Sequence, residues 1–352
     1  MTLLKLVSIF LGVNNSTILD SKSLSKNVPE AFRNHYERII FPKIHTFDKR
    51  RIEDLKYFRK NLFIAIIITP LIITAGLFLV IWMDNYNGLD TIIVVCAIFC
   101  AILYLWYWAF SPITDYKSYI KDEVYPNIFS YFGSDFIYKR ESLMEAEIFA
   151  NAGVVPRFIT KKCEDYIKGR YNGTVFELTE AQLLTFRHRY DLRSQTVFRG
   201  YLIRLNMKKK VSGHTAVRNR KGLIYRFYSW IYTTNWFPAK ISELEKVRFE
   251  DPVFQRKFEV RSSDQVEARY LLTPAFMESL IDLEHCFGEK AVSCAFYDND
   301  LLISVKYKSN KFEVGSAFNA MTFVEESKFI LGEMNSIFSI IDILQQNEKT
   351  II

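Results

Sequence analysis

The sequence predicts an α+β membrane protein: a two-helix transmembrane hairpin with a helical stalk, followed by a cytoplasmic domain built on an antiparallel sheet with a long C-terminal helix. Three observations predict this fold class. Residues 62–110 contain no Lys, Arg or His. After residue 134, hairpin signals outnumber strand–helix–strand patterns. Near its end, the chain carries a long amphipathic stripe at 325–346.

Composition sets the broad class before any element is assigned. The 352 residues are 49% hydrophobic and 24% charged, with a formal net charge of +7. These proportions exclude a disordered, collagen-like or disulfide-stabilised small protein. The five cysteines form no CxxC pair, so we expect free thiols in a chain that faces the cytoplasm.

Two uncharged runs predict the transmembrane hairpin. The run Leu62–Met83 has 22 residues, and a helix of that length rises about 33 Å, enough to cross a hydrocarbon core of about 30 Å. The second run, Thr91–Phe110, has 20 residues. The polar turn at 84–90 is so short that the two helices must be antiparallel. The alternative is a buried helical hairpin of a soluble protein, which seldom has two uncharged runs of this length.

The distribution of charge predicts the orientation of the hairpin. Residues 1–60 carry 12 Lys and Arg against 6 acidic residues, while the turn carries only Asp84 and Asp90. Lys117 and Lys121 follow the second run closely. Because cytoplasmic flanks of membrane helices are enriched in Lys and Arg, we expect both termini in the cytoplasm.

Helical stripes on either side of the hairpin predict a stalk. Apolar residues recur at helical spacing over 29–40 and 44–58, and again over 113–124 until Pro126. Within the second run, Cys96 and Ala97 begin a face of small residues that repeats at Cys100 and Ala101. We expect this face to allow close approach to the first run rather than to bind metal, or else to mediate self-association of the hairpin.

These features divide the chain into four predicted parts. Residues 1–60 form a cytoplasmic N-terminal helical segment and residues 61–110 the transmembrane hairpin. Residues 111–133 form a juxtamembrane helix, and residues 134–352 the cytoplasmic α+β domain.

Local signals predict the elements of the last part. Ser142 and Glu145 form a capping box for a helix that ends near residues 152–153. Asn172-Gly173 and Asp298-Asn299-Asp300 mark hairpin turns, the latter in preference to a cation site. The remaining predictions are a strand at 195–206, a strand pair at 246–249 and 256–260, a helix from Pro274 to about Phe287, and a helix at 325–346.

Several stretches of this part resemble a known family. They include Asn172-Gly173-Thr174, Phe198-Arg199-Gly200, Glu250-Asp251-Pro252 and, most specifically, the stretch from Ser263-Asp264-Gln265-Val266-Glu267 to Thr273-Pro274. The chain resembles bacterial two-pass membrane proteins called domain of unknown function 3137, over about residues 50–345. The resemblance implies a multi-pass protein of the bacterial inner membrane. It implies no activity and no catalytic residue.

The most informative stretch of the last part is basic. Between Arg204 and Arg226 the chain carries eight Lys or Arg and no acidic residue. For a domain held at a bilayer, anionic lipid headgroups are the nearest partner, at about 1 kcal/mol per basic residue near the surface. A solvated loop is the alternative, and nucleic acid is disfavoured because aromatic residues are sparse until Tyr225. The candidate contacts for lipid or a protein partner are Lys208, Lys209, Lys210, Arg218, Arg220 and Lys221.

No motif predicts a cofactor or a metal, because the chain lacks a P-loop, GxGxxG, GxSxG and HExxH. The sequence therefore predicts a membrane-tethered binding or scaffold module. The alternative is a membrane-bound enzyme with a carboxylate site near Asp251, Asp264 and Glu267. A loop-to-helix junction whose charges pair with one another explains the last two residues equally well.

Overall fold

The computed structural model describes residues 28–82, 88–188, 191–207, 211–220, 243–286, 292–306 and 323–349. The chain divides into two compact units. One is helical and extends to Ile128, and the other, which covers residues 129–313 and 325–352, is built on a β-sheet. Each unit is described by itself.

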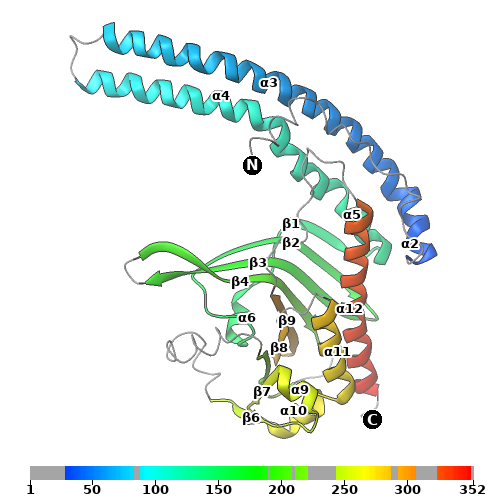
Figure 1. The fold of residues 1–352 in the computed structure, drawn as a ribbon. Helices are drawn as coiled ribbons and strands as arrows, with labels where there is room; N and C mark the ends of the chain where they lie inside the picture. The colour runs from blue at the N-terminus through cyan, green and yellow to red at the C-terminus, as the bar shows by residue number, and fades with distance from the viewer. Residues whose placement is uncertain are drawn as a thin grey trace. The chain divides into compact units, whose positions relative to one another are not determined.

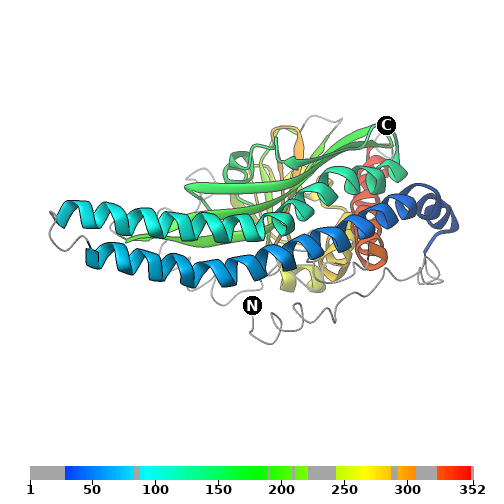
Figure 2. The ribbon, with the colours of Figure 1, turned by 90° about the horizontal axis from the view of Figure 1, so that it is seen from above.

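Two long helices dominate the helical unit, and Figures 1 and 2 show them antiparallel and side by side. They are α3 (Phe41–Trp82) and α4 (Gly88–Glu123). The chain enters α3 through α2 (Glu30–His35) and one π-helical turn, η2 (Tyr36–Ile40), and leaves α4 through α5 (Tyr125–Phe129). The 42 residues of α3 form one uninterrupted helix. The predicted hairpin helices and stalk helices are thus continuous with each other.

A seam of buried side chains runs along α3. Apart from the adjacent pair Phe47 and Asp48, its members recur every three or four residues: Ile44, Phe47, Asp48, Arg51, Leu55, Phe58, Leu62 and Ala65. Arg51 is fully buried, and its Nε atom donates to Asp48 Oδ1 at 2.8 Å. Farther along the seam, Phe58 and Leu62 pack against Trp106 and Phe110 of α4. This spacing is typical of a helix that packs along one face against an antiparallel partner.

The close approach between α3 and α4 is made differently from the prediction. Cys96 and Cys100 are exposed, so the face of small residues points away from α3. Gly76 of α3 takes that role instead, because a Cβ atom there would lie 2.5 Å from Ile98 Cδ1. The side of α4 that carries Ile98 meets α3 at Gly76, and the side that carries Cys96 and Cys100 does not.

Both long helices contain an 18-residue window that is long and apolar enough to cross a membrane. Only 11% of the window in the first helix and 6% of the window in the second is buried within the protein. By length and composition, these are two candidate membrane spans.

The second unit contains a nine-stranded sheet in which every neighbouring pair is antiparallel, as predicted for an α+β fold. The spatial order of the strands is β1-β2-β3-β4-β9-β8-β5-β7-β6. The strands are β1 (Ile137–Glu141), β2 (Thr160–Tyr171), β3 (Thr174–His188), β4 (Asp191–Asn206), β5 (Thr215–Asn219), β6 (Glu245–Val247), β7 (Phe258–Ser262), β8 (Val292–Tyr297) and β9 (Asp300–Lys306).

Both predicted hairpin turns are confirmed. Asn172 and Gly173, between β2 and β3, have φ angles of 47° and 79°. Asp298 and Asn299, between β8 and β9, have φ angles of 51° and 63°. Two successive positive φ angles are typical of the tight turn that matches the twist of antiparallel strands, and Asn, Asp and Gly reach them at the lowest cost.

Helices cover both faces of the sheet (Figure 1). The short helix α6 (Glu147–Asn151) and its flanking loops pack on one face over Leu183 and Leu302. On the opposite face lie α11 (Pro274–Cys286) and α12 (Phe323–Lys349), which confirm the predicted helices. Phe338 of α12 stacks on Tyr171 at 4.0 Å between ring centroids, and Phe276 of α11 contacts Phe296.

Some local predictions are wrong. Ser142 caps no helix, because its hydroxyl accepts from Met144 N and α6 begins only at Glu147. The predicted strand at 256–260 starts at Phe258, because Asp251 caps a short helix, α9 (Pro252–Lys257), that takes the preceding residues. The strands β1 and β5 were not predicted, and neither was α10 (Gln265–Leu271).

Candidate functional site

The basic stretch is not one surface loop, because the fold distributes its residues. Arg204 lies in β4, Arg218 lies in β5, and Arg220 follows the end of β5. β5 is an inner strand between β8 and β7, which excludes a solvated loop for 215–219. The candidates Lys208, Lys209, Lys210 and Lys221 lie outside the described residues.

Arg204 belongs to a row of paired charges across four strands, here called the charge ladder (Lys168, Glu177, Arg204 and Asp300). Lys168 Nζ lies 3.0 Å from Glu177, and Arg204 Nε lies 2.7 Å from Asp300 Oδ2. Burial raises the pKa of Asp300, although the charge and hydrogen bond of Arg204 lower it in part. The ladder holds two cations and two carboxylates, so its charges compensate one another.

Arg218 is also used by the fold. Its Nε atom donates to Gly153 O at 3.1 Å, in the loop that follows α6. Side chains of a strand alternate between faces, so Arg218 and the core residue Ala216 lie on the α6 face of the sheet. Arg218 therefore ties β5 to the α6 segment.

Arg220 lines a cavity of about 250 Å³ at the edge of the sheet. The register of β6 and β7 ends at the pair Val247–Val260. The chain then diverges from β7 and returns to it through α9, so an opening remains between the two strands. This basic cavity is lined by Arg220, Lys246, Val247, Arg248, Phe249, Phe254, Gln255, Phe258 and Val260.

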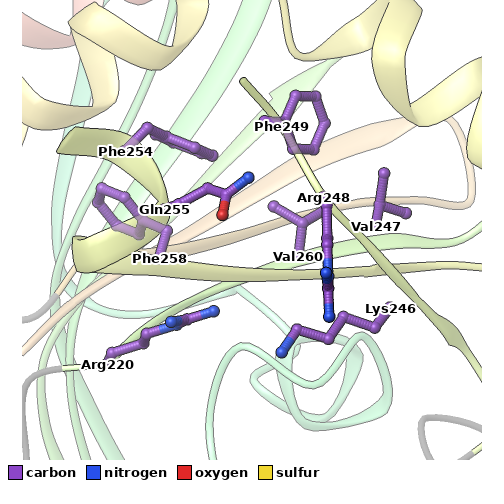
Figure 3. A pocket seen from close by; sticks show the side chains of 9 residues that line it. All are labelled: Arg220, Lys246, Val247, Arg248, Phe249, Phe254, Gln255, Phe258 and Val260. Carbon is purple, nitrogen blue, oxygen red and sulfur yellow. The ribbon is translucent and has the colours of Figure 1, made fainter. Parts of the chain in front are cut away.

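The basic cavity has an apolar side and a cationic side. Figure 3 shows Phe254, Phe258 and Val260 on one side of the β7 ribbon and Arg220 and Lys246 on the other. The phenyl rings are buried, with Phe254 and Phe258 at 0% and 1% exposure. The three cationic side chains of the lining, Arg220, Lys246 and Arg248, are exposed. The rings therefore supply a rigid wall of low polarity, and the surface open to a ligand is mainly cationic.

Glu259 lies on the cationic side and shows how strong the positive charge is there. Burial acts to raise the pKa of Glu259, but a hydrogen bond and charge from Arg261 and the charges of Lys246 and Arg220 outweigh it, so the net pKa is lowered. Arg261 Nε donates to the carboxylate at 2.9 Å. The Glu259 carboxylate thus lies near several cations, and its direct hydrogen bond is to Arg261.

A buried carboxylate fastens the framework of the cavity. Glu284 of α11 is fully buried and accepts from Asn219 Nδ2 at 3.0 Å and from Lys257 Nζ at 2.8 Å. Asn219 directly precedes Arg220, and Lys257 directly precedes Phe258. The backbone N–H of Arg220 also donates to Lys257 O at 2.7 Å. Glu284 therefore positions two segments that carry cavity residues.

The carboxylates of the enzyme hypothesis do not line the basic cavity. Asp251 accepts from the backbone N–H groups of Val253 and Phe254, and so caps α9. Asp264 caps α10 in the same way. Glu267 accepts from Ser212 N and Gly213 N rather than pairing with a charged neighbour, and Arg269 lies over the Phe249 ring instead. All three carboxylates satisfy helix ends or a loop.

The cysteines and the possible metal ligands offer no reactive site among the described residues. Burial raises the pKa of the Cys163 thiol to about 11 and raises that of Cys294 as well, which makes both poor nucleophiles. Among the described residues, no group of three or more His, Cys, Asp or Glu side chains is arranged to hold a metal ion.

Sequence reasoning identified Arg220 and missed Lys246 and Arg248. A signal for them was present in the alternation Lys246-Val247-Arg248-Phe249, which puts cations on one face of a strand and apolar residues on the other. Only the divergence of β6 from β7, which no local pattern encodes, turns that alternation into a cavity beside Arg220.

Comparisons with known proteins give few matches. No curated protein matches the chain. The crystal structure of the mycobacterial trehalose monomycolate transport factor A, TtfA, is similar with 11% identity and a TM-score of 0.30, over 58% of this chain and 88% of that chain. The family described as "Protein of unknown function (DUF3137)" matches residues 196–346, which include the basic cavity. Over these residues, the chain is similar to the DUF3137 family.

Proposed function

We propose that this protein is a membrane-tethered binding module that holds an anionic ligand in the basic cavity. In this proposal, α3 and α4 cross the inner membrane of a bacterium and both termini lie in the cytoplasm. The observation that carries the proposal is the cationic side of the cavity. Within the described part of the chain, Arg220, Lys246 and Arg248 have no carboxylate within salt-bridge distance.

The contrast with other cations of the sheet unit supports a binding role. Lys161, Lys162 and Lys257 each have a carboxylate within 3.0 Å. Gathering three exposed cations at one cavity costs free energy through mutual repulsion, and a bound anion relieves that cost. Guanidinium forks suit the oxygens of carboxylate and phosphate groups.

The exposed apolar surface of the helical unit supports the tether. Large apolar side chains such as Phe78, Trp82 and Phe99 are 72%, 68% and 61% exposed. Exposing such an apolar surface to water along two whole helices is unfavourable, whereas it is favourable in the hydrocarbon core of a bilayer. Anionic lipid headgroups are then abundant near the tethered unit, which favours them as ligands.

Binding is tested on the full-length protein in a neutral detergent. A water-soluble short-chain anionic phospholipid is titrated and followed by calorimetry. We expect saturable binding that Arg220→Gln and Lys246→Gln each weaken about tenfold. Lys139→Gln is the matched control, because Lys139 lies in the edge strand β1 at the opposite end of the sheet order. Equal affinity for the control and the two cavity variants would contradict the proposal.

The tether is tested separately, in cells. We expect the chain to remain in the membrane pellet after alkaline carbonate extraction. We also expect a fluorescent reporter fused after the C-terminus to fold in the cytoplasm. A chain released by carbonate, or a C-terminal reporter active only in the periplasm, would remove the membrane part of the proposal while leaving the cavity to be tested.

Self-association is a second candidate role, and the exposed small-residue face of α4 favours it. Cys96 and Cys100 are exposed, so two hairpins could pack through this face in a bilayer. Mild oxidation of membranes should then produce a covalent dimer that disappears in the double variant Cys96→Ser with Cys100→Ser. An unchanged monomer band would refute self-association through this face.

A further inference from the structure

We infer that the basic cavity selects a phosphate monoester, a dianion with three terminal oxygens, over a phosphodiester with a single negative charge. This inference rests on the proposed function and specifies its ligand class. Its basis is the juxtaposition of three exposed cations from two chain segments around one small opening whose opposite wall is aromatic (Figure 3).

The number and kind of cations indicate the charge of the ligand. Arg220 and Arg248 offer two guanidinium forks, and Lys246 offers a compact ammonium group. Forks bind two oxygens of a planar or tetrahedral anion, and an ammonium group binds a third. A monoester presents three free oxygens to these groups. A diester presents only two, so one cation stays without an oxygen partner.

The internal counter-ion does not satisfy the cations. Glu259 is the carboxylate whose pKa the charges of Lys246 and Arg220 help to lower, yet Arg261 holds it at 2.9 Å. Glu245, which precedes Lys246 in the edge strand β6, accepts from Gln265 Nε2 at 2.7 Å. These two carboxylates are therefore engaged by other side chains, and a dianion compensates more of the remaining charge than a monoanion does.

The size of the cavity indicates a headgroup rather than a chain. Its volume is about 250 Å³, below the roughly 300–1,000 Å³ of sites that enclose drug-sized ligands. The buried phenyl rings of Phe254 and Phe258 expose almost no surface for an alkyl chain. They do lower the local polarity, which strengthens each contact between a cation and a phosphate oxygen. Gln255 remains as a neutral partner for a hydroxyl group near the phosphate.

The same chemistry is found on a lipid and on a soluble metabolite, so the experiment uses both. Full-length protein in neutral detergent is titrated with dihexanoyl phosphatidic acid, with dihexanoyl phosphatidylglycerol and with glycerol 3-phosphate. We expect the phosphatidic acid to bind at least about tenfold more tightly than the phosphatidylglycerol. Glycerol 3-phosphate binding as tightly as phosphatidic acid would support a soluble monoester, and much weaker binding would support a lipid.

Charge variants test whether the cavity is the site. Lys246→Gln should weaken phosphatidic acid binding about tenfold and phosphatidylglycerol binding less. Glu259→Gln removes the internal counter-ion and should strengthen phosphatidic acid binding about threefold. A purely structural role for both residues would weaken binding in both variants. If Lys246→Gln fails to fold, as judged by thermal unfolding, Arg248→Gln replaces it, because Arg248 is exposed.

The outcomes separate this inference from the proposed function. Equal affinity for the two lipids, with both lost in Arg220→Gln, would overturn the monoester preference and leave anion binding standing. If citrate, titrated in the same way, binds more tightly than all three phosphate compounds, the monoester preference is overturned in favour of a multivalent carboxylate. No binding of any anion would overturn the inference and the proposed function together.

Discussion

The charge ladder and the basic cavity lie on the same sheet and use the same residue types, yet they differ in one respect. In the ladder, Arg204 lies 2.7 Å from Asp300, whose side chain is 1% exposed. In the cavity, Arg220 and Lys246 share the field of one carboxylate, Glu259, that Arg261 already holds. Each cation of the ladder has a carboxylate within salt-bridge distance, whereas among the described residues Arg220, Lys246 and Arg248 have none.

Register explains this difference. In the middle of the sheet, Lys168, Glu177 and Arg204 are direct partners across β2, β3 and β4, so opposite charges meet on one face. At the edge, β6 pairs over only three residues before the chain leaves for α9. Among the described residues, Arg248 then has no strand partner across from it. Pairing geometry therefore sets where charge is compensated, and the end of pairing sets where it is not.

The largest expected effect is the loss of a cation from the ladder. Arg204→Met leaves Asp300 buried without its ion-pair partner. Breaking a buried pair costs about 3–5 kcal/mol, and because the Arg204 side chain is 39% exposed we expect about 2 kcal/mol. Thermal unfolding followed by circular dichroism should then show a decrease of several degrees. A decrease no larger than that of Lys139→Gln would show that the ladder is not needed for stability.

Loss of positive charge from the cavity should instead lower ligand affinity and leave stability nearly unchanged. The double variant Arg220→Gln with Lys246→Gln should change stability by no more than about 0.5 kcal/mol, because both side chains are exposed. Its affinity for a short-chain anionic phospholipid should fall about 30-fold or more, which corresponds to about 2 kcal/mol. A large decrease in the unfolding temperature would mean that the cavity cations stabilise the fold, which would weaken the contrast with the ladder.

Acid should act on the ladder through Glu177. Burial acts to raise its pKa, but hydrogen bonds from Tyr166 and Lys168 and the charges of Lys168 and Arg204 lower it below 4.5 overall. A carboxyl group with a lowered pKa stabilises the fold above its unfolded pKa, and this contribution is lost as pH falls through the lower folded value. Glu177→Gln should therefore cost about 1 kcal/mol at pH 7 and progressively less as the pH falls below 4.5 through the lowered pKa. A loss that does not change with pH would contradict this assignment.

The smallest effect is expected for the run of three lysines at 208–210, the densest cluster of positive charge in the basic stretch. Replacing Lys208, Lys209 and Lys210 by Gln should reduce affinity for a soluble anionic ligand less than about threefold, because the proposal assigns the direct contacts to Arg220, Lys246 and Arg248, and charges without a direct contact act only through screened attraction. Calorimetry in low and moderate salt measures this. A reduction larger than that of Lys246→Gln would place the binding site on the lysine run.

Local sequence signals predicted the elements whose causes are local. Asn172-Gly173 gave its hairpin because only a few residue types reach two positive φ angles. Thr273-Pro274 gave α11, with the Thr273 hydroxyl accepting from Phe276 N. The capping box at Ser142 failed although it is the same kind of signal. There the hydroxyl closes a short turn with Met144 N instead.

The candidate site was predicted only in part, because its residues meet through non-local pairing. Arg220 stood out in a run of basic residues, while Lys246 and Arg248 looked like ordinary polar positions of a short strand. Asp264 and Glu267 were candidates either for a carboxylate site or for a loop-to-helix junction with paired charges, but both oxygens of Glu267 are engaged by the loop at Ser212 and Gly213, 54–55 residues away. No single-sequence pattern reports such a contact.

The sequence alone determined the class of the chain: two uncharged helices, hairpins marked by their turn residues, and an excess of positive charge. These follow from the solubility and backbone preferences of individual residues, which act over a few positions. Tertiary structure alone decided which cations are compensated, which face of α4 meets α3, and where the cavity opens. Those outcomes depend on strand register and helix packing, which bring together residues that are far apart in the chain.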